Sequence, residues 1–179
     1  MEYVEGPLLF DLCKNIGPMG EDVGRYFAQQ LVEQLEYINS NGVVHRDIKL
    51  ENILLDGDLK LKLADFGFAT KTNIEQLTSF RGTQSYMAPE IRAGQVYNGK
   101  QTDIFSMGVV LFTLVVGYFP FSAAEDNDSF YNFLTQGEVD SDGINAAYWK
   151  TLKGSHLSHE FKQLMQQIFS KDGSKRPTI

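Results

Sequence analysis

The feature that most constrains this chain is a predicted β-hairpin with a polar motif on each side. An apolar run at residues 53–55 and an alternating run at residues 59–63 flank Asp56-Gly57-Asp58, which is typical of two strands joined by a tight turn. The sequence His-Arg-Asp-Ile-Lys-Leu-Glu-Asn at residues 45–52 precedes the hairpin, and Asp-Phe-Gly at residues 65–67 follows it. Because the chain runs out and back, we expect Asn52 and Asp65 to lie close together.

Apolar residues repeat at helical spacing in residues 21–42 and 158–169, and residues 102–116 are nearly all apolar, so the expected fold class is mainly α with a small β-hairpin. The predicted helices span residues 8–14, about 21–42, 102–116, 130–135 and 158–169. One face of the second helix carries Val23, Phe27, Leu31, Leu35 and Ile38. The helix at 102–116 is nearly all apolar, which predicts burial on most sides. Ser158 is the expected N-cap of the last helix, and residues 70–80 are predicted to form a loop.

Composition and charge narrow the classes of partner. The 179 residues are 42% hydrophobic and 22% charged, as in a globular domain, and the net charge is −7 with both signs interspersed. Nucleic acids and anionic membranes attract clustered Lys and Arg, so neither is expected as a partner. The most apolar stretch, residues 107–121, is interrupted by glycine and proline and is too short to span a bilayer. Cys13 is the single cysteine, which fits a reducing compartment.

The two motifs around the hairpin contain the groups that phosphoryl transfer requires. Asp47 can orient a hydroxyl group and accept its proton, and Lys49 can place a cation on a transferring phosphate. Asn52 and Asp65 offer hard oxygen ligands of the kind that Mg²⁺ prefers. A lone aspartate is more often a turn or capping carboxylate, so this interpretation depends on the four residues together.

Together with Ala-Pro-Glu at residues 88–90, these motifs resemble the catalytic loop, the metal-binding loop and the end of the activation segment of protein kinases. Lys49 and the sequence at residues 82–90 resemble the serine/threonine class. Residues 65–70 and 87–90 resemble the calcium/calmodulin-dependent and AMP-activated group. The resemblance covers nearly the whole chain. It implies a partial protein kinase domain over residues 1–179, with a hinge at 1–7 and a C-terminal helical lobe at 8–179 whose final helix is truncated.

The resemblance further implies an enzyme that transfers the terminal phosphate of ATP, with Mg²⁺, to Ser or Thr of protein substrates. Asp47 would be the base, Lys49 the phosphate contact, Asn52 and Asp65 the metal ligands, and Thr83 a bridge between Asp47 and Lys49. The implied cofactor-binding residues are Glu2, Val4, Glu51, Asn52, Leu54 and Asp65. The implied structural residues are His45, Arg46, Phe66, Glu90, Asp103 and Arg176, where Asp103 would hold the catalytic-loop backbone and Glu90 would pair with Arg176. Three alternatives stay open: an ordinary turn threonine at position 83, a surface salt bridge between Glu90 and Arg176, and a frayed terminus at residues 1–7.

Arg46, beside the expected catalytic aspartate, implies regulation by phosphorylation, because such an arginine can pair with a phosphate on the activation segment. Ser79 is the expected phosphosite, with Thr78 as its substitute and an upstream activating kinase as a partner. The alternative is that both are unmodified loop hydroxyl groups. The expected location is the cytoplasm, with the nucleus as the second choice.

The 179 residues contain no Gly-rich phosphate loop, no strand lysine for the inner phosphates and no glutamate partner on a preceding helix, all of which belong to the family's N-terminal β lobe. We therefore expect a fragment, a truncated gene product or a naturally shortened protein, with negligible kinase activity by itself. The rival hypothesis is a non-catalytic, lobe-only interaction module or decoy. Intact Asp47, Lys49, Asn52 and Asp65 favour the enzyme, whereas the missing lobe favours the rival.

Overall fold

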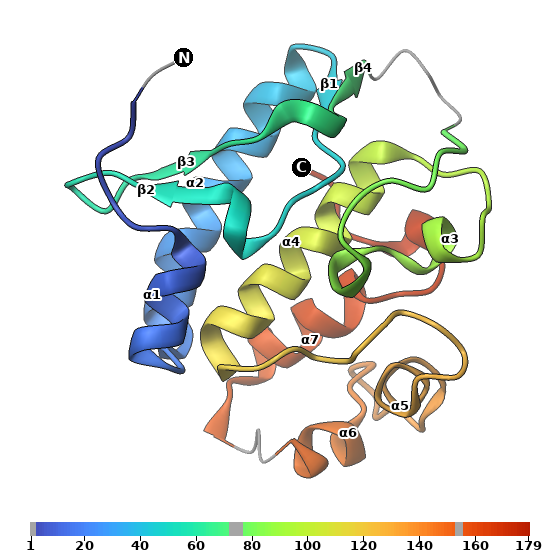
Figure 1. Cartoon of the computed structure of the whole chain (residues 1–179). Helices are drawn as coiled ribbons and strands as arrows, with labels where there is room; N and C mark the ends of the chain where they lie inside the picture. Colours follow the sequence, from blue (N-terminus) through green and yellow to red (C-terminus); the bar gives the residue numbers. More distant parts are fainter. Residues whose placement is uncertain (1–2, 72–76, 153–155) are drawn as a thin grey trace.

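A computed structural model describes residues 3–71, 77–152 and 156–179 of the chain. These residues contain seven α-helices, so the expectation of a mainly helical domain with a small hairpin is confirmed. Figure 1 shows short strands at one end of the molecule and α5 and α6 at the other. The helices are α1 (Leu9–Ile16), α2 (Gly20–Ser40), α3 (Pro89–Arg92), α4 (Gly99–Val116), α5 (Ser129–Gln136), α6 (Ala146–Thr151) and α7 (His159–Ile168).

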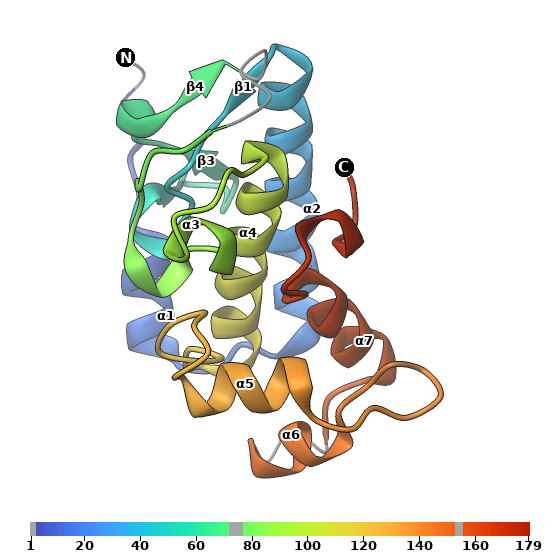
Figure 2. The same cartoon turned by 90° about the vertical axis from the view of Figure 1, so that its right-hand side faces the viewer.

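Helix α4 runs through the middle of the domain (Figures 1 and 2) and packs against both α2 and α7. Two glycines allow this close packing. A Cβ atom on Gly24 of α2 would lie 2.4 Å from Val115, and one on Gly108 of α4 would lie 2.2 Å from Ile168 of α7. Rings of Phe105, Phe112, Phe121 and Phe169 fill the space between α4 and the C-terminal segments.

Among the described residues, α4 is the one helix that is long and apolar enough to cross a membrane, with a mean hydropathy of 1.2. It begins at Gly99, so it is longer than the apolar stretch seen in the sequence. However, 78% of it is buried inside the domain. The protein core thus already covers the apolar side chains of α4, which is typical of the central helix of a folded domain.

The predicted hairpin forms between β2 (Ile53–Leu55) and β3 (Leu61–Leu63), with Ile53 opposite Leu63 and Leu55 opposite Leu61. The second strand is shorter than predicted. Leu59 has φ of 60°, and the Asp56 carboxylate accepts hydrogen bonds from the backbone N–H of Asp58 and Lys60, so the turn extends to residue 60.

A second ladder, which the sequence did not indicate, joins β1 (Val43–Val44) to β4 (Thr70–Lys71) in antiparallel orientation. Residues 70–71 were expected to belong to a loop. They form a strand because a distant segment, β1, supplies the hydrogen-bond partners. The ladder closes residues 45–69 into one loop that contains both polar motifs.

Helix α2 follows the predicted pattern with one exception. Phe27, Leu31 and Leu35 are buried, but Val23 is 40% exposed and Gly24 takes the position facing α4. Helix α6 was not predicted, because residues 122–153 show weak periodicity.

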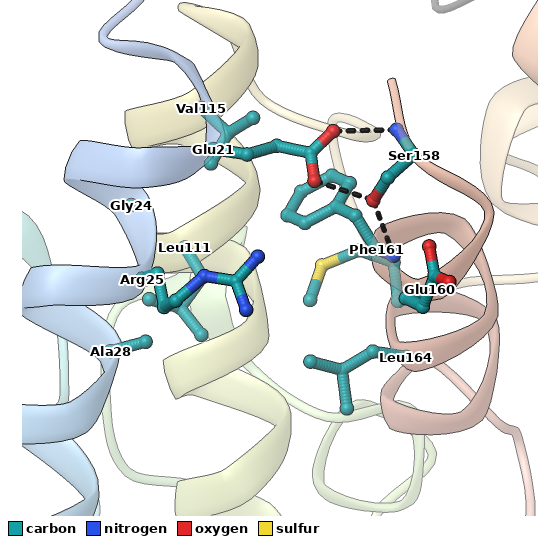
Figure 3. A pocket seen from close by; sticks show the side chains of 11 residues that line it. Glu21, Gly24, Arg25, Ala28, Leu111, Val115, Ser158, Glu160, Phe161 and Leu164 are labelled. Atoms are coloured by element: carbon teal, nitrogen blue, oxygen red, sulfur yellow. Dashed lines mark hydrogen bonds between the residues drawn. The ribbon is translucent and has the colours of Figure 1, made fainter.

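Ser158 caps α7 as expected, since its Oγ accepts a hydrogen bond from the backbone N–H of Phe161 at 3.1 Å. Figure 3 shows that Glu21 of α2 reaches Ser158, and its carboxylate accepts from both the Ser158 backbone N–H and hydroxyl at 2.5 Å. Glu21 and Ser158 both line an apolar cavity between α2, α4 and α7. None of the candidate site residues lines this cavity.

Candidate active site

One buried acidic side chain of α4, Asp103, anchors the backbone of the loop at residues 45–52. Asp103 is 1% exposed, and its two oxygens accept hydrogen bonds from the backbone N–H groups of His45 at 2.7 Å and Arg46 at 2.8 Å. Arg46 has φ of 68°, a left-handed conformation that a non-glycine residue rarely adopts. The Asp103 hydrogen bonds therefore fix a backbone turn that local preference would not choose.

Asp47 is the centre of a polar cluster. Its Oδ2 accepts from Lys49 Nζ at 2.7 Å and from Asn52 Nδ2 at 3.0 Å. Its Oδ1 accepts from both the backbone N–H and the hydroxyl of Thr83 at 3.0 Å. Thr83 Oγ1 also accepts from Lys49 Nζ at 2.9 Å, so Thr83 lies between Asp47 and Lys49.

The charge state of Asp47 follows from this cluster. Burial raises the pKa of its carboxyl group, but the hydrogen bonds from Lys49, Thr83 and Asn52, together with the Lys49 charge, outweigh burial and leave the pKa below its usual value. Asp47 is thus a carboxylate at neutral pH with all of its roughly four acceptor positions engaged. A further hydroxyl group can bind it only by displacing one of the present donors.

Thr83 reaches Asp47 because residue 82 is glycine. Gly82 has φ of +109°, and a Cβ atom there would lie 2.8 Å from the carbonyl oxygen of Arg46. Any side chain would push the two segments apart. The glycine therefore positions residue 83 against residues 46 and 47, which are 36 or more positions away in sequence.

The hairpin brings Asn52 and Asp65 to the same end of β2 and β3. Ile53 pairs with Leu63, and the Asn52 carbonyl oxygen accepts from Ala64 N–H at 2.9 Å, so Asp65 follows directly after this contact. Asp65 has φ of 57° and an exposed side chain, whose Oδ1 accepts from Gly67 N–H at 3.1 Å. Two left-handed non-glycine residues, Arg46 and Asp65, therefore flank the cluster, and such strain gathers at functional sites.

The donor set suits a hard cation. Asn52 Nδ2 donates to the carbonyl oxygen and the carboxylate of Asp47 at 2.9 and 3.0 Å, which leaves its amide oxygen without a hydrogen bond from the described residues. Asp65 contributes a carboxylate with one oxygen outside the Gly67 hydrogen bond. Carboxylate and amide oxygens are ligands that Mg²⁺ accepts. No group of three or more His, Cys, Asp or Glu side chains that could hold a metal occurs in the described ranges.

His45 connects the two motifs. It is fully buried, its Nε2 lies 3.0 Å from the Ala64 carbonyl oxygen, and its Nδ1 accepts from Asp47 N–H at 3.3 Å. Burial lowers its pKa, although the Ala64 hydrogen bond opposes the shift. The ring is therefore neutral at pH 7, with the proton on Nε2. Phe66, which is 46% exposed, packs edge-to-face on it with ring centroids 4.8 Å apart.

Arg46 points toward the expected phosphosite. Its guanidinium donates to Ser79 Oγ at 3.0 Å and to the Phe68 carbonyl oxygen at 2.6 Å, and the Tyr97 hydroxyl donates to the Ser79 carbonyl oxygen at 2.9 Å. Ser79 is half-buried, whereas Thr78 is exposed. These contacts favour Ser79 over Thr78 as the phosphosite that would pair with Arg46.

Glu90 and Arg176 form a bidentate ion pair with oxygen–nitrogen distances of 2.6 and 2.7 Å. The Arg176 side chain is 0% exposed and that of Glu90 is 12% exposed, so this is not a surface salt bridge. Arg176 also donates to the carbonyl oxygens of Ser170 and Gln101, and its guanidinium lies 5.0 Å from the Phe105 ring centroid. The pair ties α3 to the C-terminal segment.

The first described residues lie along β2. The Leu55 N–H donates to the Pro7 carbonyl oxygen at 3.0 Å, and Leu8 forms a bridge with Leu54. Val4 and Leu54 are half-buried, while Glu2 and Met1 lie outside the described residues. The expected hinge and the apolar floor at Leu54 are thus neighbours.

Glu51 does not join the Asn52–Asp65 end of the hairpin through any contact that the structure records. Its carboxylate accepts a hydrogen bond from the Tyr86 hydroxyl at 3.2 Å. Sequence reasoning missed Tyr86 and also Ser106, whose hydroxyl donates to the Tyr86 carbonyl oxygen at 2.8 Å. A polar residue on an otherwise apolar helix was the signal that could have identified Ser106.

A mainly helical domain that carries these three motifs around one polar cluster is typical of protein kinases, and the comparisons with known proteins agree. The whole chain, residues 1–179, matches the family model described as protein kinase domain. The serine/threonine-protein kinase SRK2B of Arabidopsis thaliana is 37% identical over 182 residues, covering 100% of this chain and 48% of the relative. SAPK7 of Oryza sativa subsp. japonica is also 37% identical, covering 100% and 49%. SRK2A of Physcomitrium patens is 36% identical, covering 100% and 50%.

The chain therefore belongs to the protein kinase family, and the resemblance to its serine/threonine class is confirmed. The calcium/calmodulin-dependent and AMP-activated group is compatible with these relatives. The chain spans about half the length of the curated relatives that it matches.

Proposed function

We propose that this chain forms the C-terminal, substrate-side lobe of a protein serine/threonine kinase and contributes its catalytic base. Residues 1–7 would be the hinge to a second lobe, and residues 8–179 the helical lobe. The observation that carries the proposal is the Asp47 carboxylate, held at hydrogen-bond distance by Lys49, Asn52 and Thr83. The position, orientation and ionisation of Asp47 are those that a base acting on a substrate hydroxyl needs.

Each residue of the cluster has a separate task in this proposal. The Ser or Thr hydroxyl of a protein substrate displaces Lys49 from Asp47, and Lys49 turns to the transferring phosphate. The substrate oxygen bonds to the terminal phosphorus of ATP, the bond from that phosphorus to the oxygen of the leaving ADP breaks, and Asp47 takes the hydroxyl proton. Thr83 stays on Asp47 Oδ1 and keeps the carboxylate oriented.

Asn52 and Asp65 would hold Mg²⁺, which supplies positive charge to offset the charge that spreads over the phosphate oxygens. The amide oxygen of Asn52 is available for this, because the nitrogen of the same group is fixed on Asp47. Val4 and Leu54, together with Glu2, would contact the adenine.

We also infer that an upstream kinase regulates this domain at Ser79. A phosphate on Ser79 would replace a neutral hydroxyl at 3.0 Å from the Arg46 guanidinium and convert one hydrogen bond into a charge-assisted pair. Arg46 adjoins Asp47 in the chain. A phosphate that fixes residues 77–83 through Arg46 would therefore also affect the position of the Asp47 carboxylate.

A chimera tests the function. The segment of Arabidopsis SRK2B that aligns with this chain would be replaced by residues 1–179, and transfer of labelled phosphate from ATP to a Ser/Thr peptide would be measured. We expect transfer by the chimera, a roughly 10²- to 10⁴-fold loss in Asp47→Asn, and negligible transfer by the 179-residue chain alone. A chimera that unfolds cooperatively but transfers no phosphate, or an Asp47→Asn variant with full activity, would refute the proposal.

A further inference from the structure

Residues 77–83 lead from the expected phosphosite to the Asp47 cluster, and we call them the docked segment. At one end of this segment, Thr83 is fixed on Asp47. At the other end, hydrogen bonds join the segment to a single residue, Tyr97, which lies between α3 and α4. Tyr97 is outside the Asp47 cluster, and sequence reasoning did not single it out.

The backbone of Tyr97 pairs with Leu77 as an isolated antiparallel bridge. The Tyr97 N–H donates to the Leu77 carbonyl oxygen at 2.9 Å, and the Leu77 N–H donates to the Tyr97 carbonyl oxygen at 3.1 Å. The Tyr97 hydroxyl also donates to the Ser79 carbonyl oxygen at 2.9 Å. Tyr97 therefore satisfies main-chain groups at two positions of the docked segment, whatever group the Ser79 side chain carries.

A small apolar cluster supports these hydrogen bonds. Tyr97 is 3% exposed and Leu77 is 6% exposed, and they pack together with the buried side chains of Val44, Met87 and Ile91. Burial of such side chains is favourable without any charged partner. Apolar contacts and hydrogen bonds thus order the same end of the docked segment.

The contacts of Ser79 are of two kinds. Its hydroxyl oxygen accepts from the Arg46 guanidinium at 3.0 Å and is the atom that a phosphate would occupy. Its carbonyl oxygen accepts from Tyr97. A phosphate would strengthen the contact with Arg46 and would leave the bond from Tyr97 in place. Tyr97 and a phosphate would therefore hold the same residue through different atoms.

A buried tyrosine is often a core side chain whose hydroxyl group simply needs a partner. Tyr148 is of this kind, since it is fully buried and its hydroxyl donates to the Pro120 carbonyl oxygen at 3.1 Å. Tyr97 differs from Tyr148 because its partner belongs to the segment that ends on Asp47.

We propose that Tyr97 is a positioning residue, which holds the docked segment in place before Ser79 is phosphorylated, so that Thr83 orients Asp47 with or without the phosphate. This inference rests on the proposed kinase function. It implies basal phosphate transfer by the unphosphorylated enzyme. It also makes Tyr97 and the Ser79 phosphate partly interchangeable, because both favour the same ordered state.

Trypsin can measure how firmly the docked segment is held in the 179-residue chain, without any catalysis. Arg81 lies in this segment and is exposed, and the backbone around it must open locally before trypsin can cut. Tyr97→Phe removes the hydroxyl and keeps the ring. We expect cleavage after Arg81 to become about three- to tenfold faster, as the loss of one hydrogen bond predicts. Cleavage after Lys60, which is exposed in the hairpin turn, should not change.

Tyr148→Phe is the matched control, because it also removes a buried hydroxyl that donates to a carbonyl oxygen. It should leave the rate of cleavage after Arg81 unchanged. An unchanged rate in Tyr97→Phe, or an equal increase in both variants, would overturn the proposal.

The chimera separates positioning from a merely structural role. After phosphatase treatment, Tyr97→Phe should lower kcat about three- to tenfold, with KM for ATP unchanged. Once Ser79 carries a phosphate, most of this loss should disappear, because the charge-assisted pair with Arg46 then holds the segment. Equal losses in the two forms would overturn the proposal, and so would full activity of the unphosphorylated Tyr97→Phe chimera.

The two proposals fail in different ways. If the chimera transfers phosphate but Tyr97→Phe changes neither the cleavage rate nor kcat, the kinase function stands and the role of Tyr97 is wrong. If Tyr97→Phe opens the docked segment to trypsin but a folded chimera transfers no phosphate, Tyr97 still holds the segment and the kinase function is wrong.

Discussion

Two halves of one helix show how differently this domain is built at its two ends. The C-terminal half of α4, from Gly108 to Val116, is apolar apart from Thr113 and packs between α2 and α7. The N-terminal half places the polar side chains of Thr102, Asp103 and Ser106 in equally buried positions. Asp103 and Ser106 hold backbone segments that contain the candidate active site.

The two halves of α4 differ in the kind of contact that replaces water around their side chains. In the helical core formed by α2, α4 and α7, the stabilising free energy is spread over many non-directional contacts. A lost methyl group there leaves a local gap. In the polar region formed by residues 45–52, 79–90, 103 and 176, single hydrogen bonds satisfy buried charges, and a lost partner leaves a charge without solvation. We therefore expect substitutions that keep the shape of a side chain but change its charge or hydrogen bonding to lower stability more in the polar region than in the helical core.

The largest effect should come from Glu90→Gln, which keeps shape but removes the charge that pairs with fully buried Arg176. We expect the free energy of unfolding to fall by about 3–5 kcal/mol, because an unpaired buried charge remains. Denaturant titration measures this. The control is Lys171→Ala, which breaks a pair whose side chains are 36% and 83% exposed and should cost at most about 1 kcal/mol. A similar loss in the free energy of unfolding for both variants would contradict the expected sensitivity of the polar region.

Asp103→Asn should cost about 1–3 kcal/mol at pH 5, because the side-chain NH2 group of Asn cannot accept a hydrogen bond and leaves one of the His45 and Arg46 N–H groups unpaired, whereas both oxygens of a protonated Asp103 can still accept. Burial raises the pKa of Asp103 to about 7, although these two hydrogen bonds and the Arg46 charge oppose the shift. The folded pKa therefore lies above the unfolded value of about 3.9. The resulting stabilisation is complete below pH 4 and is lost as pH rises through 7.

The stability deficit of Asp103→Asn relative to wild type should consequently shrink as pH rises from 5 to 8. Urea unfolding of both proteins at several pH values checks the slope. A deficit that stays constant over this range would show that burial does not raise the Asp103 pKa.

A substitution in the helical core should act by volume alone. Gly108→Ala would place a Cβ atom 2.2 Å from Ile168, so α7 must shift. Overpacking of this kind costs about 1–3 kcal/mol, partly offset by the better helix propensity of alanine. We expect a net loss of about 1–2 kcal/mol in thermal unfolding, with no pH dependence. Gly57→Ala, where no atom lies within 4 Å, is the control and should change stability by less.

The smallest effect on stability should come from Ser79→Ala, which removes one neutral hydrogen bond to Arg46 and should cost about 1 kcal/mol or less. Its effect on regulation should be larger. After incubation with a cell extract and ATP, mass spectrometry should find phosphate on Ser79, and the chimera should gain activity that Ser79→Ala lacks. Phosphate on Thr78 and equal activation of the Ser79→Ala chimera would show that Thr78, not Ser79, is the regulatory phosphosite.

Much of this arrangement could be predicted from residue order. Helical periodicity located α2 and α7 to within a few residues, because burial of one face imposes a regular spacing. A nearly all-apolar run located α4. The Ser158 cap and the hairpin were predicted for the same kind of local reason, since turn and cap chemistry depends on adjacent residues. The short motifs also identified the residues that meet around Asp47, through their resemblance to a known family.

What the sequence by itself determined was therefore local: which segments are helices, where the hairpin turns and which side chains carry chemistry. The tertiary structure alone decided that Gly24 rather than Val23 faces α4, that β4 pairs with β1 and that Ser79 rather than Thr78 meets Arg46. These outcomes depend on contacts between residues far apart in the chain, and the free energy of such contacts is set by packing and by the satisfaction of buried polar groups, which no local pattern encodes.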